Sequence, residues 1–249
     1  MAELPVLEDN RALRAMKEDD RPRPPSEVRY ELKLPADAAL LPQVRSWIRL
    51  HPEGFRAAYP TRLVNNLYLD APGLTNLAEN LAGQAERRKL RLRWYGDTPS
   101  PPIVHAILEL KIKHGSVGDK RRLPLPEPLA LNLPYSDLLP ALRAAVNEEW
   151  RPWLQRAGQP ALINRYRRDY FVSPDGVIRC TLDYEQAFFD QRFSVYPNLS
   201  HALAALDRIV VEVKAPVSVG ERLERAMDSF PIPRDRHSKY VDGLLYGIY

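Results

Sequence analysis

Residues 86–95 read ERRKLRLRWY, and this stretch decides the fold. Side chains along a β-strand alternate between its two faces, so residues two apart share a face. From residue 89 to residue 94, one face carries only cations, Lys89, Arg91 and Arg93, and the other carries only apolar side chains, Leu90, Leu92 and Trp94. The stretch therefore predicts a strand with one face in a hydrophobic core and a strongly cationic opposite face.

Four further stretches show the same alternation, at residues 29–34, 108–113, 178–183 and 211–214. The charged residues on their polar faces are, in chain order, Arg29, Glu31, Lys33, Glu109, Lys111, Lys113, Arg179, Asp183, Glu212 and Lys214. Over all five strands, nine cations accompany four carboxylates. A single strand of this kind is most often half of an antiparallel sheet with one wet face. Five of them side by side would instead form a broad charged surface.

If the sheet closes on itself, this charged surface becomes its interior. A dry core cannot hold so many cations, because each unpaired buried ion costs several kcal/mol. A tunnel filled by a polyanion can hold them, because charge-assisted hydrogen bonds to phosphate oxygens are strong. The pattern therefore predicts a closed antiparallel barrel with a cationic interior and a phosphate-rich ligand.

The remaining sequence supplies the other elements of an α+β fold. Strands are expected at residues 27–34, 63–70, 86–95, 103–113, 161–172, 177–184 and 208–215, with further strand character at 122–125 and 187–193. Helices are expected at residues 36–50, 74–81, 136–157, 219–230 and 238–246. The Gly-containing connections at 114–118 and 173–176 are typical of hairpins and so of antiparallel pairing. Amphipathic helices at 36–50, 136–157 and 219–230 can cover the apolar outer faces of the strands.

The composition is that of a globular protein. Of its 249 residues 45% are hydrophobic, and 36 Lys or Arg against 32 Asp or Glu give a net charge of +4. This excess is too small to indicate nucleic acid by itself, and no aromatic residues interleave on the charged face of residues 86–93 to stack on bases. The single cysteine, Cys180, excludes an internal disulfide and a Cys-based zinc site.

The N-terminus differs from the rest of the chain. Residues 1–25 are charged and Pro-rich and lack the apolar segment of a secretory signal. No run of 18 apolar residues predicts a membrane-spanning helix anywhere in the sequence. We expect a cytosolic protein with a tail at residues 1–25 and one domain at residues 26–249.

Eight segments, in this order, resemble the VTC domain, the catalytic domain of the vacuolar transporter chaperone complex and of its bacterial relatives. They are RYELK (29–33), NNLYLD (65–70), ERRKLRLRWYG (86–96), ILELKIKHGSVGDKRR (107–122), NRYRRDYF (164–171), IRCTLDYE (178–185), IVVEVKAP (209–216) and DRHSKYVDG (235–243). That family belongs to the triphosphate tunnel metalloenzymes. The resemblance implies a closed tunnel of eight antiparallel strands with flanking helices. It also implies transfer of the γ-phosphate of ATP to a growing polyphosphate chain with Mn²⁺ or Mg²⁺.

The resemblance also assigns roles to residues of this chain. The expected catalytic residues are Lys33, Arg91, Arg93, Lys111, Arg168 and Lys239. The expected substrate-binding residues, some from the resemblance and some from the strand pattern, are Arg29, Lys89, Lys113, Tyr166, Arg179, Lys214, Arg236 and Ser238. Glu212 matches the metal-binding glutamate, and Glu31 and Glu109 match acidic tunnel positions of the wider superfamily. Arg236 stands where the family would have lysine, which keeps the charge but changes the phosphate geometry.

Two alternatives to a polymerase remain open, a metal-dependent inorganic or nucleoside triphosphatase and a non-catalytic polyphosphate-binding module. The excess of cations favours a long polyanion over a single metal-bound triphosphate. The five histidines show no HExxH spacing, and a terminal phosphate needs no strong base to attack. Nucleic acid is not the expected partner. The membrane helices of the fungal subunits have no counterpart in the sequence, which leaves a separate membrane-protein partner, at the inner face of the membrane, open.

Overall fold

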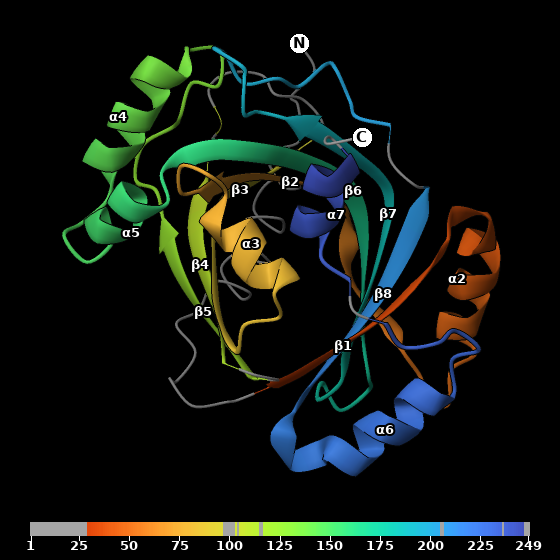
Figure 1. The fold of residues 1–249 in the computed structure, drawn as a ribbon. Coiled ribbons are helices and arrows are strands. Elements are labelled where there is room, and N and C mark those ends of the chain that lie inside the picture. The colour runs from red at the N-terminus through yellow and green to blue at the C-terminus, as the bar shows by residue number, and fades with distance from the viewer. Residues whose placement is uncertain are drawn as a thin grey trace, which may run out of the picture.

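The computed structural model describes residues 29–96, 103, 105–114, 117–204, 207–235 and 237–246, so the expected tail at residues 1–25 lies outside the described part. The strands form one antiparallel sheet in the order β1–β8–β7–β6–β2–β3–β4–β5 (Figure 1). Their bounds are β1 Arg29–Asp37, β2 Arg56–Asp70, β3 Glu86–Tyr95, β4 Ile107–His114, β5 Val117–Pro124, β6 Gln159–Val172, β7 Arg179–Asp190 and β8 Arg208–Pro216. The α-helices are α2 Leu41–Arg49, α3 Thr75–Leu81, α4 Tyr135–Ala145, α5 Arg151–Arg156, α6 Gly220–Asp228 and α7 Lys239–Tyr246, with 3₁₀ turns at Ala38–Leu40 and Val217–Val219. The predicted α+β class with eight antiparallel strands is confirmed.

The sheet curls until its two edges approach each other. Lys111 on β4 and Glu31 on β1 belong to strands near opposite ends of the sheet, yet the Lys111 Nζ lies 2.9 Å from the Glu31 Oε1. Within the described residues no ladder of hydrogen bonds joins β5 to β1, so the sheet is open along this seam. The curvature follows the prediction, and closure by hydrogen bonding stays a prediction.

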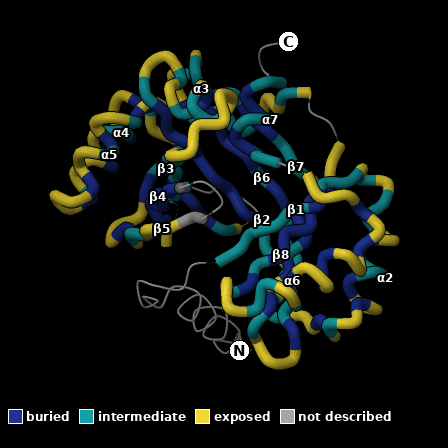
Figure 2. The backbone as a smooth tube through the Cα atoms, turned by 60° about the horizontal axis from the view of Figure 1, so that its bottom comes forward, coloured by how far each residue is buried: buried dark blue, intermediate teal, exposed yellow. Residues whose placement is uncertain are grey.

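Helices cover the outer face of the curled sheet on two sides, as Figure 1 shows. On one side, α4 and α5 pack against strands β2 to β4, with Leu92, Leu108 and Leu138 among the fully buried side chains. On the other side, α2 and α6 pack against β1, β7 and β8. The strands are mostly buried and the outward sides of these helices exposed (Figure 2). The expected helical cover of the apolar faces is confirmed.

Two helices lie at the inner face instead. Helix α7 packs on β6 and β7 and contacts α3, in a cluster that includes Tyr68, Leu162 and Tyr240. A side chain at Gly243 would not fit, because a Cβ atom there would lie 2.5 Å from Leu162 and from Phe188. The Tyr240 hydroxyl donates to the buried carboxylate of Asp70, which also accepts from backbone amides at the start of α3. These contacts place the N-terminus of α7 on the charged face of the sheet.

Several predicted ends of strands and helices were wrong, because proline or an apparent helical spacing suggested a different boundary. Strand β1 continues through Pro35 to Asp37, so the helix expected at 36–50 starts later; β1 is an edge strand, where proline is tolerated. Strand β2 begins seven residues earlier than expected, and register shifts between residues 57 and 62 accommodate Pro60. The helix expected at 136–157 is two helices, α4 and α5. The strand expected from residue 103 begins at Ile107, because Ile103 forms only an isolated bridge to Leu129.

A bulge in β7 alters which side chains face inward. The two strands expected at 177–184 and 187–193 are one strand, with a register shift against β6 and a positive φ of 51° at Glu185. The extra residue reverses the alternation. Asp183 and Phe188 therefore both lie on the inner face, although they are five positions apart in the strand.

Candidate functional site

The charged residues of the strands gather on the inner face around four carboxylates, those of Glu31, Glu109, Asp183 and Glu212. The cations that contact them come from six strands and from α7, and they are Lys33, Arg91, Arg93, Lys111, Lys120, Arg122, Arg168, Lys214 and Lys239. We call these residues, together with Lys89, the inner charge cluster. All six residues predicted as catalytic contact these carboxylates: Lys33 contacts two of them, and each of the other five contacts one.

Glu109 is surrounded by four cations. Its carboxylate accepts from the Nε of Arg91 at 2.7 Å and from the Nε of Arg122 at 3.0 Å. The Arg93 Nη1 and the Lys120 Nζ each lie 3.6 Å from it. Burial by itself raises the pKa of Glu109, but Arg91, Arg93 and the two further cations outweigh it and hold that pKa well below its ordinary value. Glu109 is therefore ionised throughout the physiological range, and its surroundings keep a large positive excess.

Asp183 lies in a second group with Arg168 and Lys239. The Nε and Nη2 of Arg168 donate to its two oxygens at 2.5 and 2.7 Å, and the Lys239 Nζ donates at 2.6 Å. Burial raises the pKa of Asp183, but Arg168 and then Lys239 outweigh it, so that pKa lies below its ordinary range. The Tyr166 ring lies beside both cations, 5.2 Å from the Arg168 Cζ and 4.7 Å from the Lys239 Nζ. The bidentate pair fixes Arg168, and the helix start fixes Lys239.

Glu31 and Glu212 form the third group, on neighbouring strands β1 and β8. Lys33 lies 3.4 Å from Glu31 and 3.8 Å from Glu212, and Lys214 contacts both carboxylates. Lys111 donates to both oxygens of Glu31, at 2.9 and 3.0 Å. Burial and the charge of Glu31 raise the pKa of Glu212, yet Lys214 and Lys33 outweigh them and bring it to about 2. Two carboxylates thus share the same two ammonium groups.

The segment that leads into α7 reaches the same face. The Lys89 Nζ donates to the Ser238 Oγ at 2.8 Å, and the Lys33 Nζ donates to the backbone carbonyl of His237 at 3.0 Å. The His237 Nδ1 lies 2.8 Å from Asp242 in the first turn of α7, which orients the ring. Arg236 lies outside the described residues, so its predicted role stays a prediction. Ser238 and Lys239, which were expected at this place, do lie there.

The lysines show that the carboxylates do not neutralise the cluster. Burial, followed by the charges of Lys33 and Lys111, lowers the pKa of Lys89 to about 7. Burial lowers the pKa of Lys120 to about 7 and that of Lys111 to about 8, in each case against the attraction of a glutamate. Burial is the larger cause for each of these lysines, and neighbouring cations add to it. A polyanionic ligand would offset both effects by placing negative charge beside them.

The residues fit a divalent ion only in combination with a ligand. Glu109 and Asp183 are bound by arginine guanidinium groups, whereas Glu31 and Glu212, on neighbouring strands, contact only lysine side chains. The described residues contain no group of three His, Cys, Asp or Glu that could hold a metal by itself. Magnesium-type sites commonly use one or two carboxylates with the phosphates of a bound substrate. Glu31 and Glu212 fit that kind of shared site, and Glu109 does not.

Strand reasoning missed part of the site on β5. Lys120 was not a candidate because the expected strand began at Arg122, two residues too late. The available signal was the hairpin register, since a tight turn after β4 places Arg122 opposite Glu109 and Lys120 opposite Lys111. Arg121, which alternates to the other face, pairs with Glu149 outside. The remaining predicted substrate residues, Arg29, Lys113 and Arg179, share the inner face by register and lie at or near strand ends.

The curled antiparallel sheet thus has a buried inner face on which cations outnumber carboxylates, a surface that can accommodate a polyanion. The family model of the VTC domain matches residues 28–246, so the chain belongs to the VTC domain family. A comparison with curated protein sequences finds no match. No helix in the described part of the chain combines the length and the apolar character needed to cross a bilayer.

Solved structures of low similarity also match. The PH1819 protein from Pyrococcus horikoshii OT3 has a TM-score of 0.45 at 15% identity, covering 88% of this chain and 96% of that one. A chain of the Schizosaccharomyces pombe Mediator head module has a TM-score of 0.45 at 9% identity, covering 83% and 97%. The S. pombe Pct1 RNA triphosphatase has a TM-score of 0.34 at 11% identity, covering 91% and 85%. At these scores and identities none of them indicates a function for this chain.

Proposed function

We propose that this protein is a polyphosphate polymerase that transfers the γ-phosphate of ATP to a growing inorganic polyphosphate chain, inside a tunnel that the curled sheet encloses. The observation that carries the proposal is the inner charge cluster, in which cations exceed carboxylates by ten to four. A long polyphosphate carries a negative charge on every residue of the chain and matches such a surface along its length. Membership of the VTC domain family supports the same substrates.

Phosphoryl transfer depends on positioning and on charge neutralisation more than on covalent chemistry. Arg91, Arg93 and Arg168 present guanidinium groups whose orientations are set by hydrogen bonds to Glu109, to the Asn66 side chain and to Asp183, respectively. In this proposal they hold the non-bridging oxygens of the triphosphate. Lys239, held at the start of α7, would contact the phosphate that is transferred. Because these cations are already ordered by such contacts, little reorganisation is needed when the ligand binds.

The reaction breaks the bond between the γ-phosphorus and the β–γ bridging oxygen, and a terminal oxygen of the polyphosphate chain forms the new bond. That oxygen is already ionised, so the reaction needs no general base. When bound, Mn²⁺ or Mg²⁺ supplies positive charge close to the phosphates, and Glu31 and Glu212 are the residues that would hold it. Lys33 and Lys214 would then turn from the two glutamates to the phosphates. ADP leaves with the charge of the bridging oxygen.

The test is to incubate the purified protein with ATP and MnCl₂ and to separate the products on a polyphosphate gel. A ladder of long polymer is expected, whereas free phosphate without polymer would identify a triphosphatase. Tight polyphosphate binding without turnover would identify a binding module. Arg93→Ala should abolish synthesis, and Arg151→Ala, which removes an exposed arginine from α5, is the matched control. The assay needs no membrane-protein partner and so tests the domain itself.

A further inference from the structure

Beyond Arg93 and Arg168, the side chains on the inner face change from ion pairs to aromatic rings. Arg62 lies opposite Arg168 in the register of β2 and β6, and Tyr59 lies opposite Tyr170. Tyr95 follows Arg93 at the next inward position of β3, opposite Val64. The charges of Arg168 and Arg93 act on the Tyr170 hydroxyl, and Tyr95 acts on Arg93, so these groups continue the inner charge cluster. The face therefore runs from ion pairs into an arginine and three tyrosines.

Arg62 is held by rings and not by carboxylates. Its Cζ lies 5.3 Å from the centre of the Tyr59 ring and 5.6 Å from those of Tyr95 and Tyr170. Within the described residues it forms no ion pair with Asp or Glu, in contrast to Arg91, Arg93 and Arg168. All four side chains are partly exposed. We call Tyr59, Arg62, Tyr95 and Tyr170 the aromatic end of the inner face.

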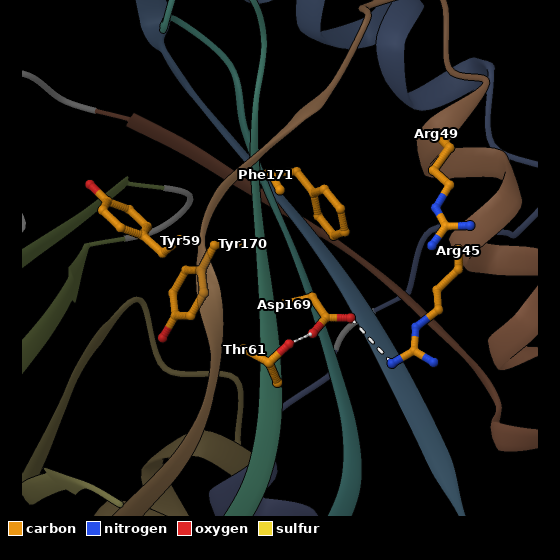
Figure 3. A pocket seen from close by; sticks show the side chains of 8 residues that line it. Arg45, Arg49, Tyr59, Thr61, Asp169, Tyr170 and Phe171 are labelled. Atoms are coloured by element: carbon orange, nitrogen blue, oxygen red, sulfur yellow. Dashed lines mark hydrogen bonds and ion pairs between the residues drawn. The ribbon is translucent and has the colours of Figure 1, made fainter. Parts of the chain in front are cut away.

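A cavity of about 290 Å³ lies between β2, β6 and α2, and Tyr59 and Tyr170 form part of its lining. Arg45, Asp169 and Phe171, which also line it, belong to the outer side of the sheet, so the cavity borders the aromatic end at the edge of the inner face. Figure 3 shows Tyr59 and Tyr170 side by side in its wall, with Phe171 further along. The Tyr59 and Tyr170 rings meet edge to face with their centres 5.7 Å apart. Asp169, the neighbour of Tyr170 in β6, points toward α2 and pairs with Arg45 at 3.3 Å. The cavity volume is close to the lower end of the roughly 300–1,000 Å³ that small-molecule sites occupy.

We propose that the aromatic end binds the nucleobase of the nucleoside triphosphate, whose phosphates extend to Arg168 and Arg93. Inorganic polyphosphate has no apolar surface and would gain nothing from three tyrosine rings. A nucleotide has phosphates at one end and a flat aromatic group at the other, which matches a face that is cationic along most of its length and aromatic at one end. Tyrosine and arginine planes are the groups on which bases stack. The inference rests on the proposed function, because it takes ATP as the substrate and assigns its adenine to the aromatic end of the inner face.

The experiment compares ATP with inorganic triphosphate, which has the phosphates but no base. Calorimetric titrations measure the Kd of each ligand for the wild-type protein, for Tyr170→Ala and for Tyr59→Ala, with Tyr196→Ala as the control. Tyr196 is a tyrosine that lies 57% exposed, outside the inner face. Loss of one stacking ring should weaken ATP roughly tenfold and leave inorganic triphosphate unchanged. Thermal melting curves check that each variant is folded. If Tyr170→Ala does not fold, Tyr59→Ala provides the test.

The outcomes separate the two proposals. Equal losses for ATP and inorganic triphosphate, or no loss for either, would overturn the nucleobase site while leaving the polymerase untouched. A base-dependent loss in a protein that makes free phosphate but no polymer would support the nucleobase site and overturn the polymerase. A wild-type protein that binds neither ligand would overturn both.

Discussion

Polyanion binding should be accompanied by proton uptake at alkaline pH. In the free protein the pKa of Lys89 and that of Lys120 are about 7, and that of Lys111 is about 8. At about pH 8.5 the first two are almost wholly neutral and the third is mostly neutral. A bound triphosphate stabilises the ammonium forms and restores these protons. The expected uptake is roughly two to three protons per ligand at about pH 8.5, falling well below one at about pH 6.

The assay is calorimetric titration of inorganic triphosphate, without metal, in two buffers of equal pH and different ionisation enthalpy. The slope of the observed enthalpy against the buffer ionisation enthalpy gives the number of protons taken up. The protons of the ligand itself enter equally for the wild-type protein and for the variants below, so the difference between proteins reports the lysines. The affinity should fall as the pH rises above about 7, since protonation then has to accompany binding.

Two variants identify the source of the protons. Lys89→Met removes a titrating ammonium and should reduce the uptake by about one proton. Arg91→Met removes a cation of the same face whose pKa is raised despite burial, so it should weaken binding and change the uptake by much less than one proton, through its smaller effect on the pKa of Lys89. An enthalpy that does not depend on the buffer at about pH 8.5 would refute the reasoning. So would a full uptake in Lys89→Met, because the lysine would then not be deprotonated in the free protein.

Stability in the absence of ligand should show the opposite dependence on pH. Unfolded lysines keep their protons up to a pKa of about 10.4, whereas these three folded lysines release theirs near 7 to 8. Between about pH 7 and 10 the unfolded state thus binds more protons than the folded state, and the free energy of unfolding rises with pH. Urea unfolding curves across this range measure the effect, and saturating triphosphate should reduce it. A free energy of unfolding that falls over this window would contradict the lowered pKa values.

Three further substitutions test single contacts. Lys239→Ala should abolish polymer synthesis without loss of the fold, because Arg168 alone still neutralises Asp183; near-normal turnover on the gel would contradict this role. Glu212→Gln should raise the Mn²⁺ concentration for half-maximal rate about tenfold or more, measured by titrating Mn²⁺ against rate, and an unchanged titration would exclude Glu212 as a ligand. Tyr240→Phe removes the buried hydroxyl that holds α7 and should lower the free energy of unfolding by about 1–3 kcal/mol, measured by urea unfolding. An unchanged unfolding midpoint would contradict this role of the hydroxyl.

Much of the charged face could be predicted because strand geometry is local. Alternation alone placed Lys89, Arg91 and Arg93 on one face of β3, and the structure confirms it. The same rule failed in β7, where the bulge after Asp183 brings Phe188 inward as well. Arg62 was not placed at all, because the expected strand began at residue 63 and β2 begins at Arg56.

The sequence by itself determined which residues share a face and that this face holds an excess of cations, because alternation depends only on the backbone of each strand. The tertiary structure decided which charges meet. Lys239 reaches Asp183, and Lys111 reaches Glu31, only because outer helices curl the sheet and α7 packs on its inner face. Such contacts join segments far apart in the chain, and their distances are set by packing between elements, which local patterns do not encode.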